Sequence, residues 1–409
     1  MSSVDTSDRH IRTSCCVAGG GPAGMMLGFL LARAGIETVV LEKHADFLRD
    51  FRGDTIHPST LEVIYELGLL EDFLRRPHSE VRELRGQVGE TEIPMADFSH
   101  LPTRCKFVAL MPQWDFLDFL AGAAKRYPQF HLHMSTSATA LIEEDGRITG
   151  TRATSAAGER EIRAELVIAA DGRHSTLRAE AGLEVIDLGA PMDVFWMRLS
   201  RRPGDAEAVL GRFDRGRILV LLDRRDYWQC AFVIRKGNAE EIRRRGLAAF
   251  RQEIASLQPM LADRVCELED WDQVKLLTVA VDRLRRWYRP GLLCIGDAAH
   301  AMWPVGGVGI NLAIQDAVAA ANILVPALRR GTVSVDRLRA VQQRRMLPTR
   351  LTQGLQLIVQ NRVIGPVLGS AGTPLTVPLP FRLLQRFPIL RRIPARLIGM
   401  GFRPEHVRP

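Results

Sequence analysis

Three junctions at the ends of apolar segments carry the residues whose types and spacing could do chemistry. The first, GGGPAG, begins at Gly19 and fits the pattern GxGxxG. The second is Asp171-Gly172 at the end of LVIAADG, and the third runs from Asp297 to Asn311 through a Trp-Pro pair and three glycines. Glycines let a phosphate or a flat ring approach the backbone, and carboxylates accept hydrogen bonds from sugar hydroxyls. Together the junctions predict a site for a nucleotide cofactor that carries a flat ring.

The first junction has the order expected of a dinucleotide site. Gly19 permits the tight turn, Gly21 lets a pyrophosphate reach the backbone, and Gly24 lets the following helix pack closely on the strand. The N terminus of that helix would face the phosphates. Glu42 follows about 20 residues on, at the end of the next strand, where it can accept hydrogen bonds from ribose hydroxyls. The alternative is a structural glycine turn with a solvent-facing Glu42.

The other two junctions are less specific when each stands alone. An Asp-Gly pair such as Asp171-Gly172 also occurs in ordinary turns. At the third junction, Asp297 can bind sugar-alcohol hydroxyls, and the new helix N terminus near Asn311 offers amides to a developing anion. His300 lies between these two residues, and it is either a catalytic base or a structural residue.

Hydrophobic period and turn signals indicate the elements that position these junctions. A strand near 13–18, a helix over about 22–34 capped by Gly35 and the strand TVVLE form a β-turn-α-β unit. Long alternating strands over 192–234 resemble a separate antiparallel sheet. The remaining expected elements are a helix over 59–75 with Ser59 or Thr60 as N-cap, a helix over 115–127, strands over 130–170, a charged helix over 238–258, β segments at 274–281 and 292–296, and helices over 312–363.

Composition fits a globular protein with a sizeable core. The chain has 409 residues, 46% of them hydrophobic and 25% charged, and shows no run of about 18 apolar residues that would span a membrane. The six cysteines form no CxxC pair, which favours buried free thiols in a reducing cytoplasm, and no His or Cys spacing fits a metal site. The formal charge of +8 raises the question of a nucleic-acid partner. The arginines are scattered, however, and attraction of an anionic cofactor or substrate explains the charge equally well.

The two termini are expected to lie outside the chemistry. Residues 1–12 are polar and lack the apolar region of a signal peptide, so we expect a flexible lead-in. The tail from about 364 to 409 mixes Arg with Phe, Leu and Ile, and prolines at 380, 388 and 394 interrupt any long helix. This pattern favours a tail that packs against the body or covers a site, and the alternative is a membrane-surface helix.

In this order and spacing, the three junctions resemble the flavoprotein monooxygenases of the para-hydroxybenzoate hydroxylase family, also called group A aromatic hydroxylases. The resemblance covers about residues 13–330. It implies an α/β fold, with a Rossmann-like FAD-binding domain, an inserted antiparallel β-sheet domain for the substrate and a helical C-terminal region. The implied divisions are 1–12 for the flexible N terminus, 13–184 together with 274–330 for the FAD-binding domain, 185–273 for the substrate domain, and 331–409 for the C-terminal helical region and tail.

The resemblance also implies a noncovalent FAD and the residues that contact it. Asp171 matches a motif linked to FAD and to NAD(P)H, and Asp297 matches the motif that holds the ribityl chain. Arg52 and Pro304 match residues that position the flavin, and no protein nucleophile is expected. The implied cofactor-binding residues are Gly19, Gly21, Ala23, Gly24, Glu42, Lys43, Arg52, Gln113, Asp171, Asp297, Gly309, Ile310 and Asn311.

By the same resemblance, NADH or NADPH reduces FAD, O₂ adds to give a C4a-hydroperoxide, and oxygen passes to a small aromatic or polycyclic substrate. The substrate would lie between the flavin and the sheet at 192–234, where alternation puts Trp196 and Arg198 on one face. The candidate substrate-lining residues are Trp196, Arg198, Arg212, Tyr227, Gln229 and Phe232.

Several alternatives stay open at this point. An epoxidase, a Baeyer-Villiger-type oxygenase, or a flavin reductase or dehydrogenase could use the same fold. A flavin-dependent halogenase is disfavoured because the segment WxWxIP is missing. A basic binding module without activity would leave the three junctions unexplained. We expect a cytoplasmic monomer or homodimer that binds neither metal nor nucleic acid.

Overall fold

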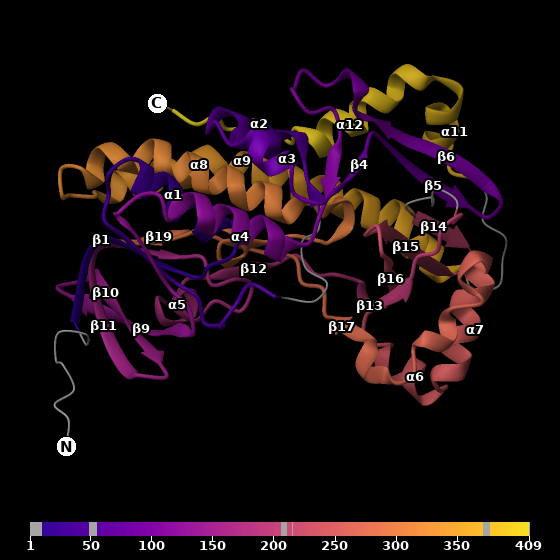
Figure 1. The fold of residues 1–409 in the computed structure, drawn as a ribbon, viewed down its shortest axis with the longest axis horizontal. Helices are drawn as coiled ribbons and strands as arrows, with labels where there is room; N and C mark the ends of the chain where they lie inside the picture. Colours follow the sequence, from indigo (N-terminus) through magenta and orange to yellow (C-terminus); the bar gives the residue numbers. More distant parts are fainter. Residues whose placement is uncertain (1–9, 49–54, 206–210, 215, 371–376, 409) are drawn as a thin grey trace.

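The computed structural model describes residues 10–48, 55–205, 211–214, 216–370 and 377–408. Figure 1 shows two large sheets towards opposite ends of the molecule, joined by the long helices α8 (Val308–Leu328) and α9 (Val335–Val359), which run side by side. The architecture is therefore the mixed α/β fold that the sequence predicts.

The first sheet is the Rossmann-like core. Its strands β20, β11, β1, β2 and β8 lie in that order, and every neighbouring pair in this series is parallel. Their apolar runs are buried, as parallel strands covered on both faces require. The strands of this sheet are β1 His10–Ala18, β2 Thr38–Leu41, β8 Phe130–His133, β9 Thr136–Glu144, β10 Arg147–Ser155, β11 Gly158–Ala169, β19 Tyr288–Arg289 and β20 Leu292–Cys294.

Helix α1 (Pro22–Arg33) is the centre of this half of the molecule. Gly21 is its N-cap and Pro22 its first residue, which suits proline because its fixed φ fits a helix start. Every residue from Ala23 to Ala32 is buried, since the helix packs against the sheet, α4 and α8. Burying one large apolar side chain such as Leu27 stabilises the fold by about 1.5–3 kcal/mol. This packing fixes where the Gly-rich turn before α1 lies.

The second sheet is antiparallel apart from one pair, and it contains the strands predicted over 192–234. A hairpin from much earlier in the chain, β5–β6, completes it through a parallel pairing of β5 with β14. The second sheet therefore contains strands from both sides of the predicted substrate domain 185–273: β5 and β6 before it, and β17 after it. The boundaries of that domain stay a prediction. In spatial order the strands are β17 Lys275–Leu277, β13 Met192–Ser200, β16 Tyr227–Arg235, β15 Arg217–Asp223, β14 Gly211–Asp214, β5 Glu83–Val88 and β6 Thr91–Asp97.

Shorter elements connect the two halves. One small sheet consists of β12 Val185–Asp187, β18 Asp282–Leu284 and β21 His300–Ala301. Another consists of β3 Thr55–Ile56, β7 Val108–Leu110 and β4 Ser79–Val81. The other helices are α2 Pro58–Glu66, α3 Leu70–Leu74, α4 Gln113–Ala124, α5 Thr176–Glu180, α6 Ala239–Arg244, α7 Leu247–Leu257, α10 Gly365–Gly369, α11 Leu379–Arg386 and α12 Arg392–Gly399. The short helical turns include η2 Phe98–His100, η6 Gly296–Ala298, η7 Val305–Gly307, the π-helical η8 Gln360–Ile364 and η9 Pro388–Arg391.

Three expected elements differ from the structure. The helix expected over 59–75 is two helices, because Gly68 at φ +73° ends α2, and its N-cap is His57 rather than Ser59 or Thr60. The charged helix near 238–258 is likewise divided at Gly246. Strand β1 begins at His10, whose partner is Glu161, so residues 10–12 are part of the sheet and not a flexible lead-in.

Helix α8 corrects another expectation. It is long and apolar enough to cross a membrane by length and composition, with a mean hydropathy of 1.6, and it is the one such helix in the described part of the chain. However, 72% of that window is buried inside the protein. A buried helix that is apolar all round is typical of the core of a large protein.

The tail packs against the body, as its prolines suggest. Helices α11 and α12 lie on β6, and Gln385 Nε2 donates to the Glu92 carbonyl at 2.8 Å. Ala395 is fully buried beside Phe98 and Leu101. The outer faces of α11 and α12 stay exposed.

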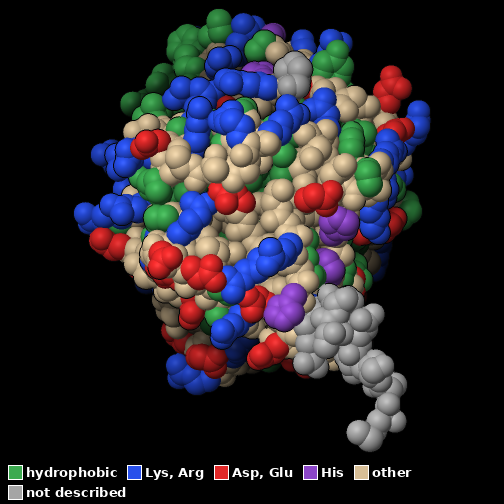
Figure 2. Space-filling view, turned by 90° about the vertical axis from the view of Figure 1, so that its left-hand side faces the viewer, with side chains coloured by type: hydrophobic (Ala, Val, Ile, Leu, Met, Phe, Trp, Pro, Cys, Tyr) green, Lys and Arg blue, Asp and Glu red, His purple; other side chains and the backbone are tan. Residues whose placement is uncertain are grey.

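The sequence predicts scattered surface charges and buried free thiols. On the end of the molecule formed by β1, β10 and β11, basic and acidic side chains are interspersed (Figure 2). The six cysteines are free thiols, and all but Cys266 are buried. Burial raises the pKa of the Cys16 thiol to about 12, which makes it unreactive near neutral pH.

Candidate functional site

The three junctions meet at one edge of the first sheet. β1 ends just before Gly19, β11 ends just before Ala170-Asp171, and β20 ends one residue before Gly296-Asp297. These strands are neighbours in the parallel series, so their carboxyl ends lie side by side. In open α/β sheets this is the edge at which ligands bind.

The glycines of the first turn fall into two kinds. Gly19 has φ +109°, and a Cβ there would lie 2.3 Å from the carbonyl oxygen of Ala170. A Cβ on Gly24 would lie 1.9 Å from the carbonyl oxygen of Gly19. A Cβ on Gly21 would meet no atom within 4 Å. Gly19 and Gly24 are therefore demanded by the chain's own packing, whereas Gly21 borders open space that a pyrophosphate can fill.

Glu42 is attached to this turn. Its Oε2 accepts a hydrogen bond from Gly20 N at 3.0 Å, its Oε1 accepts one from His44 N at 3.1 Å, and the side chain is buried. A solvent-facing Glu42 is thus wrong, because the backbone of the turn holds the carboxylate. Each carboxylate oxygen can accept more than one hydrogen bond, so capacity for ribose hydroxyls remains. The neighbouring Lys43 is exposed.

Asp171 has an acceptor that the protein does not satisfy. Its Oδ2 accepts from Leu177 N at 3.2 Å, but its Oδ1 is buried with no hydrogen-bond partner among the described residues. An unpaired buried carboxylate oxygen is costly, and a donor on a bound ligand would remove that cost. The Cβ position of Gly19 lies 2.8 Å from Asp171 N, so this acceptor sits beside the first turn.

The third junction touches the first. Gly296 has φ +59°, and a Cβ there would lie 3.0 Å from Cβ of Ala23 in the first turn of α1. Asp297 follows it and is half-buried, with its Oδ2 3.8 Å from Arg173 Nη2. The Asp297 carboxylate is therefore held beside the start of α1 and near a cation from the second junction.

The two glycines at the start of α8, the N-cap Gly307 and Gly309, also differ in function. Gly307 has φ +61°, and a Cβ there would lie 1.8 Å from Thr55 Oγ1, while the Cβ position of Gly309 is nearly open. Asn311 uses its whole side chain for packing: Oδ1 accepts from His57 N at 2.8 Å and from Thr60 Oγ1 at 2.7 Å, and Nδ2 donates to two backbone carbonyls. The Asn311 side chain thus fixes α2 against the N terminus of α8. Any cofactor contact of Ile310 and Asn311 is left to their backbone amides.

A buried ion network supports this junction, and the sequence did not predict it. His300 Nε2 lies 2.6 Å from Asp316 Oδ2, and Arg345 Nε donates to Asp316 Oδ1 at 2.9 Å. Asp316 Oδ2 also accepts from Gly296 N at 3.1 Å. Burial raises the pKa of the Asp316 carboxyl, but the charges and hydrogen bonds of His300 and Arg345 outweigh it and hold the pKa below its usual range. His300 is itself 1% exposed, which fits the structural alternative for this residue.

The network continues into the C-terminal segment. Arg345 Nη1 lies 3.4 Å from Glu405 Oε1, and Arg344 pairs with both oxygens of the same carboxylate at 2.6 and 3.0 Å. Glu405 N donates to Gln315 Oε1 in α8. The last residues of the chain are therefore tied, through α9 and α8, to the turn that holds Asp297.

His57 joins the α8 turn to the tail in a second way. Its Nδ1 lies 2.8 Å from the carbonyl oxygen of Ile398, and it also hydrogen-bonds the Gly306 carbonyl. Burial lowers the pKa of its imidazole to about 4, although both hydrogen bonds oppose that shift. His57 is therefore neutral in the folded protein at neutral pH.

This arrangement predicts a loss of stability in mild acid. The unfolded chain protonates His57 below about pH 6.5, whereas the folded chain resists protonation down to about 4, so the stabilisation present at pH 7 is lost as the pH falls through this window. The expected contribution between pH 7 and 5 is about 2 kcal/mol of unfolding free energy. Urea unfolding of the wild type and His57→Gln at both pH values tests it. In His57→Gln the free energy of unfolding should decrease less between pH 7 and pH 5 than in the wild type. An equal decrease in the two proteins would contradict the assignment.

Three further residues were predicted to contact or position the cofactor: Gln113, Pro304 and Arg52. Gln113 is the first residue of α4, half-buried, and not just before the helix as expected. Pro304 begins the turn η7, beside the fully buried Trp303. Arg52 lies outside the described residues.

The structure separates the six predicted substrate residues into two groups. Trp196, Arg198, Tyr227 and Gln229 occupy one face of the second sheet, because Arg198 pairs with Gln229 and alternation carries the others to the same side. Trp303 packs into the apolar cluster on this face, and the Arg198 guanidinium lies 5.0 Å from the Tyr227 ring centre.

The other two residues face away. Phe232 packs edge-on to Phe250 of α7 at 5.2 Å, on the face that α6 and α7 cover. Arg212 lies on that side too and reaches Gln258 at the end of α7. Their role as substrate-lining residues stays a prediction, and both side chains lie on the face opposite to that of Arg198. Alternation along a strand shows which residues share a face within that strand. It does not show which face of one strand matches which face of the next, because that depends on the strand register.

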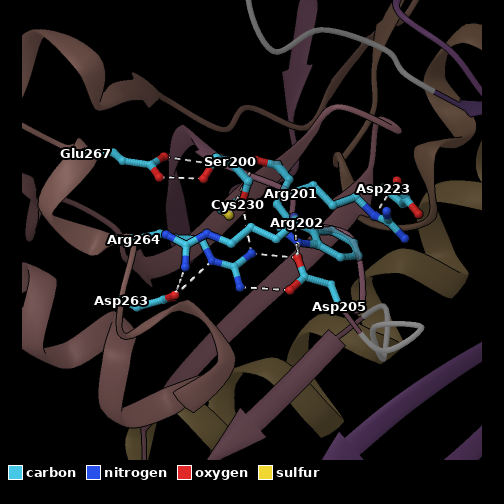
Figure 3. A network of polar contacts seen from close by, with 10 residues as sticks. Ser200, Arg201, Arg202, Asp205, Asp223, Cys230, Asp263, Arg264 and Glu267 are labelled. Atoms are coloured by element: carbon cyan, nitrogen blue, oxygen red, sulfur yellow. Dashed lines mark hydrogen bonds and ion pairs between the residues drawn. The ribbon is translucent and has the colours of Figure 1, made fainter.

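A polar network anchors the end of β13 that follows Arg198 (Figure 3). Ser200 donates from its backbone N and from Oγ to the Glu267 carboxylate at 2.7 and 2.5 Å. Arg264 forms a bidentate pair with Asp205 at 2.6 and 2.8 Å, and Trp228 Nε1 donates to the same carboxylate. The hydrogen bonds from Arg264 hold the pKa of Asp205 well below its usual range. Several hydrogen bonds and an ion pair therefore fix this end of β13 against the segment that carries Arg264 and Glu267.

Comparison with known proteins agrees with this geometry. A family model described as an FAD binding domain matches residues 12–353. A 6-methylpretetramide 4-monooxygenase of Streptomyces rimosus is 32% identical over 402 residues, covering 97% of this chain and 94% of the relative. A para-nitrophenol 4-monooxygenase of Pseudomonas sp. (strain WBC-3) is 25% identical over 328 residues, covering 77% and 78% of the two chains. The solved structure of the OxyS anhydrotetracycline hydroxylase from Streptomyces rimosus has the same fold, with a TM-score of 0.74 at 23% identity over 95% of this chain and 76% of that one.

Gly21, Glu42 and Asp171 all lie inside the region that the family model matches. Gly21 borders open space, Glu42 is fixed at the turn, and Asp171 keeps an unsatisfied acceptor, so the site fits FAD. The chain belongs to the FAD-binding-domain family and is an FAD-dependent monooxygenase of the group A flavoprotein type.

Proposed function

We propose that this monooxygenase uses NADH or NADPH and O₂ to hydroxylate a fused-ring aromatic substrate that carries phenol-type oxygens. The observation that carries the proposal is the convergence of the three junctions next to an aromatic-lined sheet face. The relative that spans nearly the whole chain is named for oxidation of a pretetramide, which supports a polycyclic substrate. When bound, FAD supplies hydride acceptance and oxygen activation.

The chain's own groups would bind and orient the cofactor. Gly21 and the N terminus of α1 receive the pyrophosphate, and Glu42 receives the ribose hydroxyls. Asp297 binds the ribityl chain, and Asp171 Oδ1 accepts from a cofactor donor. Pro304 lies at the flavin edge, where the backbone amides that start α8 stabilise negative charge.

The substrate would occupy the face that carries Trp196 and Trp303. Aromatic walls bind a flat ring system with specific geometry. Trp303 Nε1 is buried with no hydrogen-bond partner in the described part of the chain, so it can donate to a substrate oxygen. Arg198 is exposed at one end of this face and can pair with a phenolate or carboxylate.

Arg198→Ala is expected to raise KM or lower kcat for the aromatic substrate by about 10- to 100-fold while leaving FAD bound, because the lost contact is a charge-assisted hydrogen bond worth about 1.5–3 kcal/mol. Steady-state kinetics and the flavin spectrum measure the two effects separately. Arg212→Ala is the matched control, since Arg212 lies on the opposite face of the same sheet. Equal kinetics for Arg198→Ala and the wild type would remove Arg198 from the substrate site.

The first test of the proposed function is the visible spectrum of the purified protein, followed by NADH and NADPH oxidation in air with a panel of phenols, quinolones and polycyclic polyketides. We expect flavin bands and a product heavier by one oxygen atom. A ring-expanded or epoxide product would favour the other oxygenase reactions, and oxidation of NAD(P)H without oxygen insertion would favour a reductase. We also propose a cytoplasmic monomer or homodimer, which the buried free thiols support.

A further inference from the structure

The positive charge of this protein is concentrated near its C terminus. Residues 337–404 contain twelve Arg and no Asp, Glu or Lys. The formal charge of the whole chain is only +8, so the rest of the chain is net acidic. A segment this long without an acidic residue favours contact with an anionic partner.

Exposed apolar side chains gather in the same segment. Leu379, Leu383 and Phe387 are 68%, 42% and 51% exposed, and their spacing of four residues places them on one stripe of α11. Ile389 in η9 follows Phe387 by two residues, and Ile393 in α12 follows Ile389 by four; they are 64% and 58% exposed. These five are among the twelve large hydrophobic residues that are exposed in the described part of the chain, so the tail holds a disproportionate share.

The basic side chains flank that stripe. Arg382 and Arg386 are exposed and lie three and seven residues after Leu379, on its neighbouring side. Arg392 and Arg396 of α12 are exposed as well, although Arg392 Nη2 also lies 3.2 Å from His100 Nε2. We call Leu379, Leu383, Phe387, Ile389 and Ile393, with Arg382, Arg386, Arg392 and Arg396, the tail patch.

The inner faces of α11 and α12 pack against the body of the protein. A Cβ on Gly399 would lie 2.6 Å from Leu101 Cδ1, and Ala395 is fully buried. The tail patch therefore cannot turn inward to cover its own apolar stripe. Helices with one face on the protein and an apolar-basic face outward are suited to lie on a surface.

The charge decides among the occupants of the patch. In a symmetric dimer each patch would meet its own copy, which places Arg against Arg with no described Asp or Glu between them in the tail helices. A bilayer that contains anionic lipids offers both an apolar interior for the stripe and negative charge for the flanking arginines. Because a polycyclic substrate is itself apolar, such a location would also place the enzyme where its substrate partitions.

We propose that the tail patch docks the protein peripherally on an anionic lipid surface. The stripe of α11 and α12 inserts at the level of the headgroups, and the arginines contact lipid phosphates. The proposal is independent of the reaction that the flavin site catalyses.

The test is co-flotation of the FAD-loaded protein with phosphatidylcholine vesicles that either contain or lack phosphatidylglycerol. We expect the protein to float with the anionic vesicles only, and to be released as salt is raised. Arg382→Gln together with Arg386→Gln should weaken vesicle affinity by about 25-fold, because each Arg near such a surface contributes about a fivefold effect. Leu379→Gln with Leu383→Gln and Phe387→Gln should also abolish flotation, while turnover in solution stays at the wild-type level for both variants.

Matched controls lie elsewhere on the surface. Arg75→Gln with Arg285→Gln removes two exposed arginines, and Val185→Gln with Leu276→Gln removes two exposed apolar residues. Both controls should float like the wild type. The proposal is overturned if the wild type stays unbound with anionic vesicles at low salt, or if the patch variants float unchanged. It is also overturned if the apolar variant converts a stable dimer to a monomer, because the patch would then join two copies of this chain.

Discussion

Gly21→Ala is expected to give a folded protein that binds FAD more weakly, whereas Gly24→Ala is expected to impair folding itself. The added Cβ of Gly21→Ala meets no protein atom within 4 Å, and the backbone at φ −73° suits alanine. The methyl group would occupy the space that the pyrophosphate needs, and such overpacking costs about 1–3 kcal/mol, or about 5- to 150-fold in FAD affinity. At Gly24 the Cβ would lie 1.9 Å from the Gly19 carbonyl oxygen, so α1 must move away from β1.

Flavin fluorescence titration and urea unfolding without added FAD separate these two effects. Gly21→Ala should change FAD affinity with the unfolding midpoint unchanged, and Gly24→Ala should lower the midpoint. Gly122→Ala in the exposed face of α4 is the control, since its Cβ also meets open space but lies far from the junctions in sequence. Normal FAD binding by Gly21→Ala would place the pyrophosphate elsewhere.

Arg345→Met is expected to lower the free energy of unfolding by about 3–5 kcal/mol, because it leaves the carboxylates of Asp316 and Glu405 buried without their shared cation. Arg345 is fully buried and Asp316 has no exposed surface. Since Asp316 also holds Gly296 N, the variant should bind FAD more weakly even under conditions in which it stays folded.

Arg344→Met is the matched control for this prediction. Arg344 contacts the same Glu405 carboxylate, but its side chain is 33% exposed, so the expected loss is no more than about 1 kcal/mol. Urea unfolding and FAD titration of both variants provide the comparison. Equal losses for the two variants would show that burial of Arg345 is not what makes the network important.

The parts of the site that the sequence predicted are those with a local signal. Gly19, Gly21 and Gly24 stand at fixed spacing within one turn, and Asp171 and Asp297 each follow an apolar strand directly. The strand ends themselves indicate where these residues meet, because parallel strands bring their carboxyl ends to one edge. This is why the three junctions could be predicted from the sequence, and the resemblance to the flavoprotein monooxygenases then implied the fold and FAD.

The parts that escaped prediction depend on residues far apart in the chain. Nothing near His300 in sequence indicates that Asp316 will contact it in a dry interior, or that Arg345 and Glu405 will extend this network. Likewise, the faces of Arg212 and Phe232 depend on strand register, which the turns between strands set. The breaks at Gly68 and Gly246 were visible as glycines, but the helical period on either side continued across them and hid the boundary.

The hairpin β5–β6 has a consequence for how the polypeptide assembles. Residues 86–88 pair with residues 211–213, so the second sheet closes only after more than a hundred intervening residues have been synthesised. Contacts this distant slow folding, and until they form, β14 presents an open edge to other chains. A fragment cut at 185 and 273 would keep that edge permanently unpaired and so favour aggregation. The pairing of β5 with β14 therefore joins distant parts of the chain during folding, and neither half can be exchanged between relatives as one continuous segment.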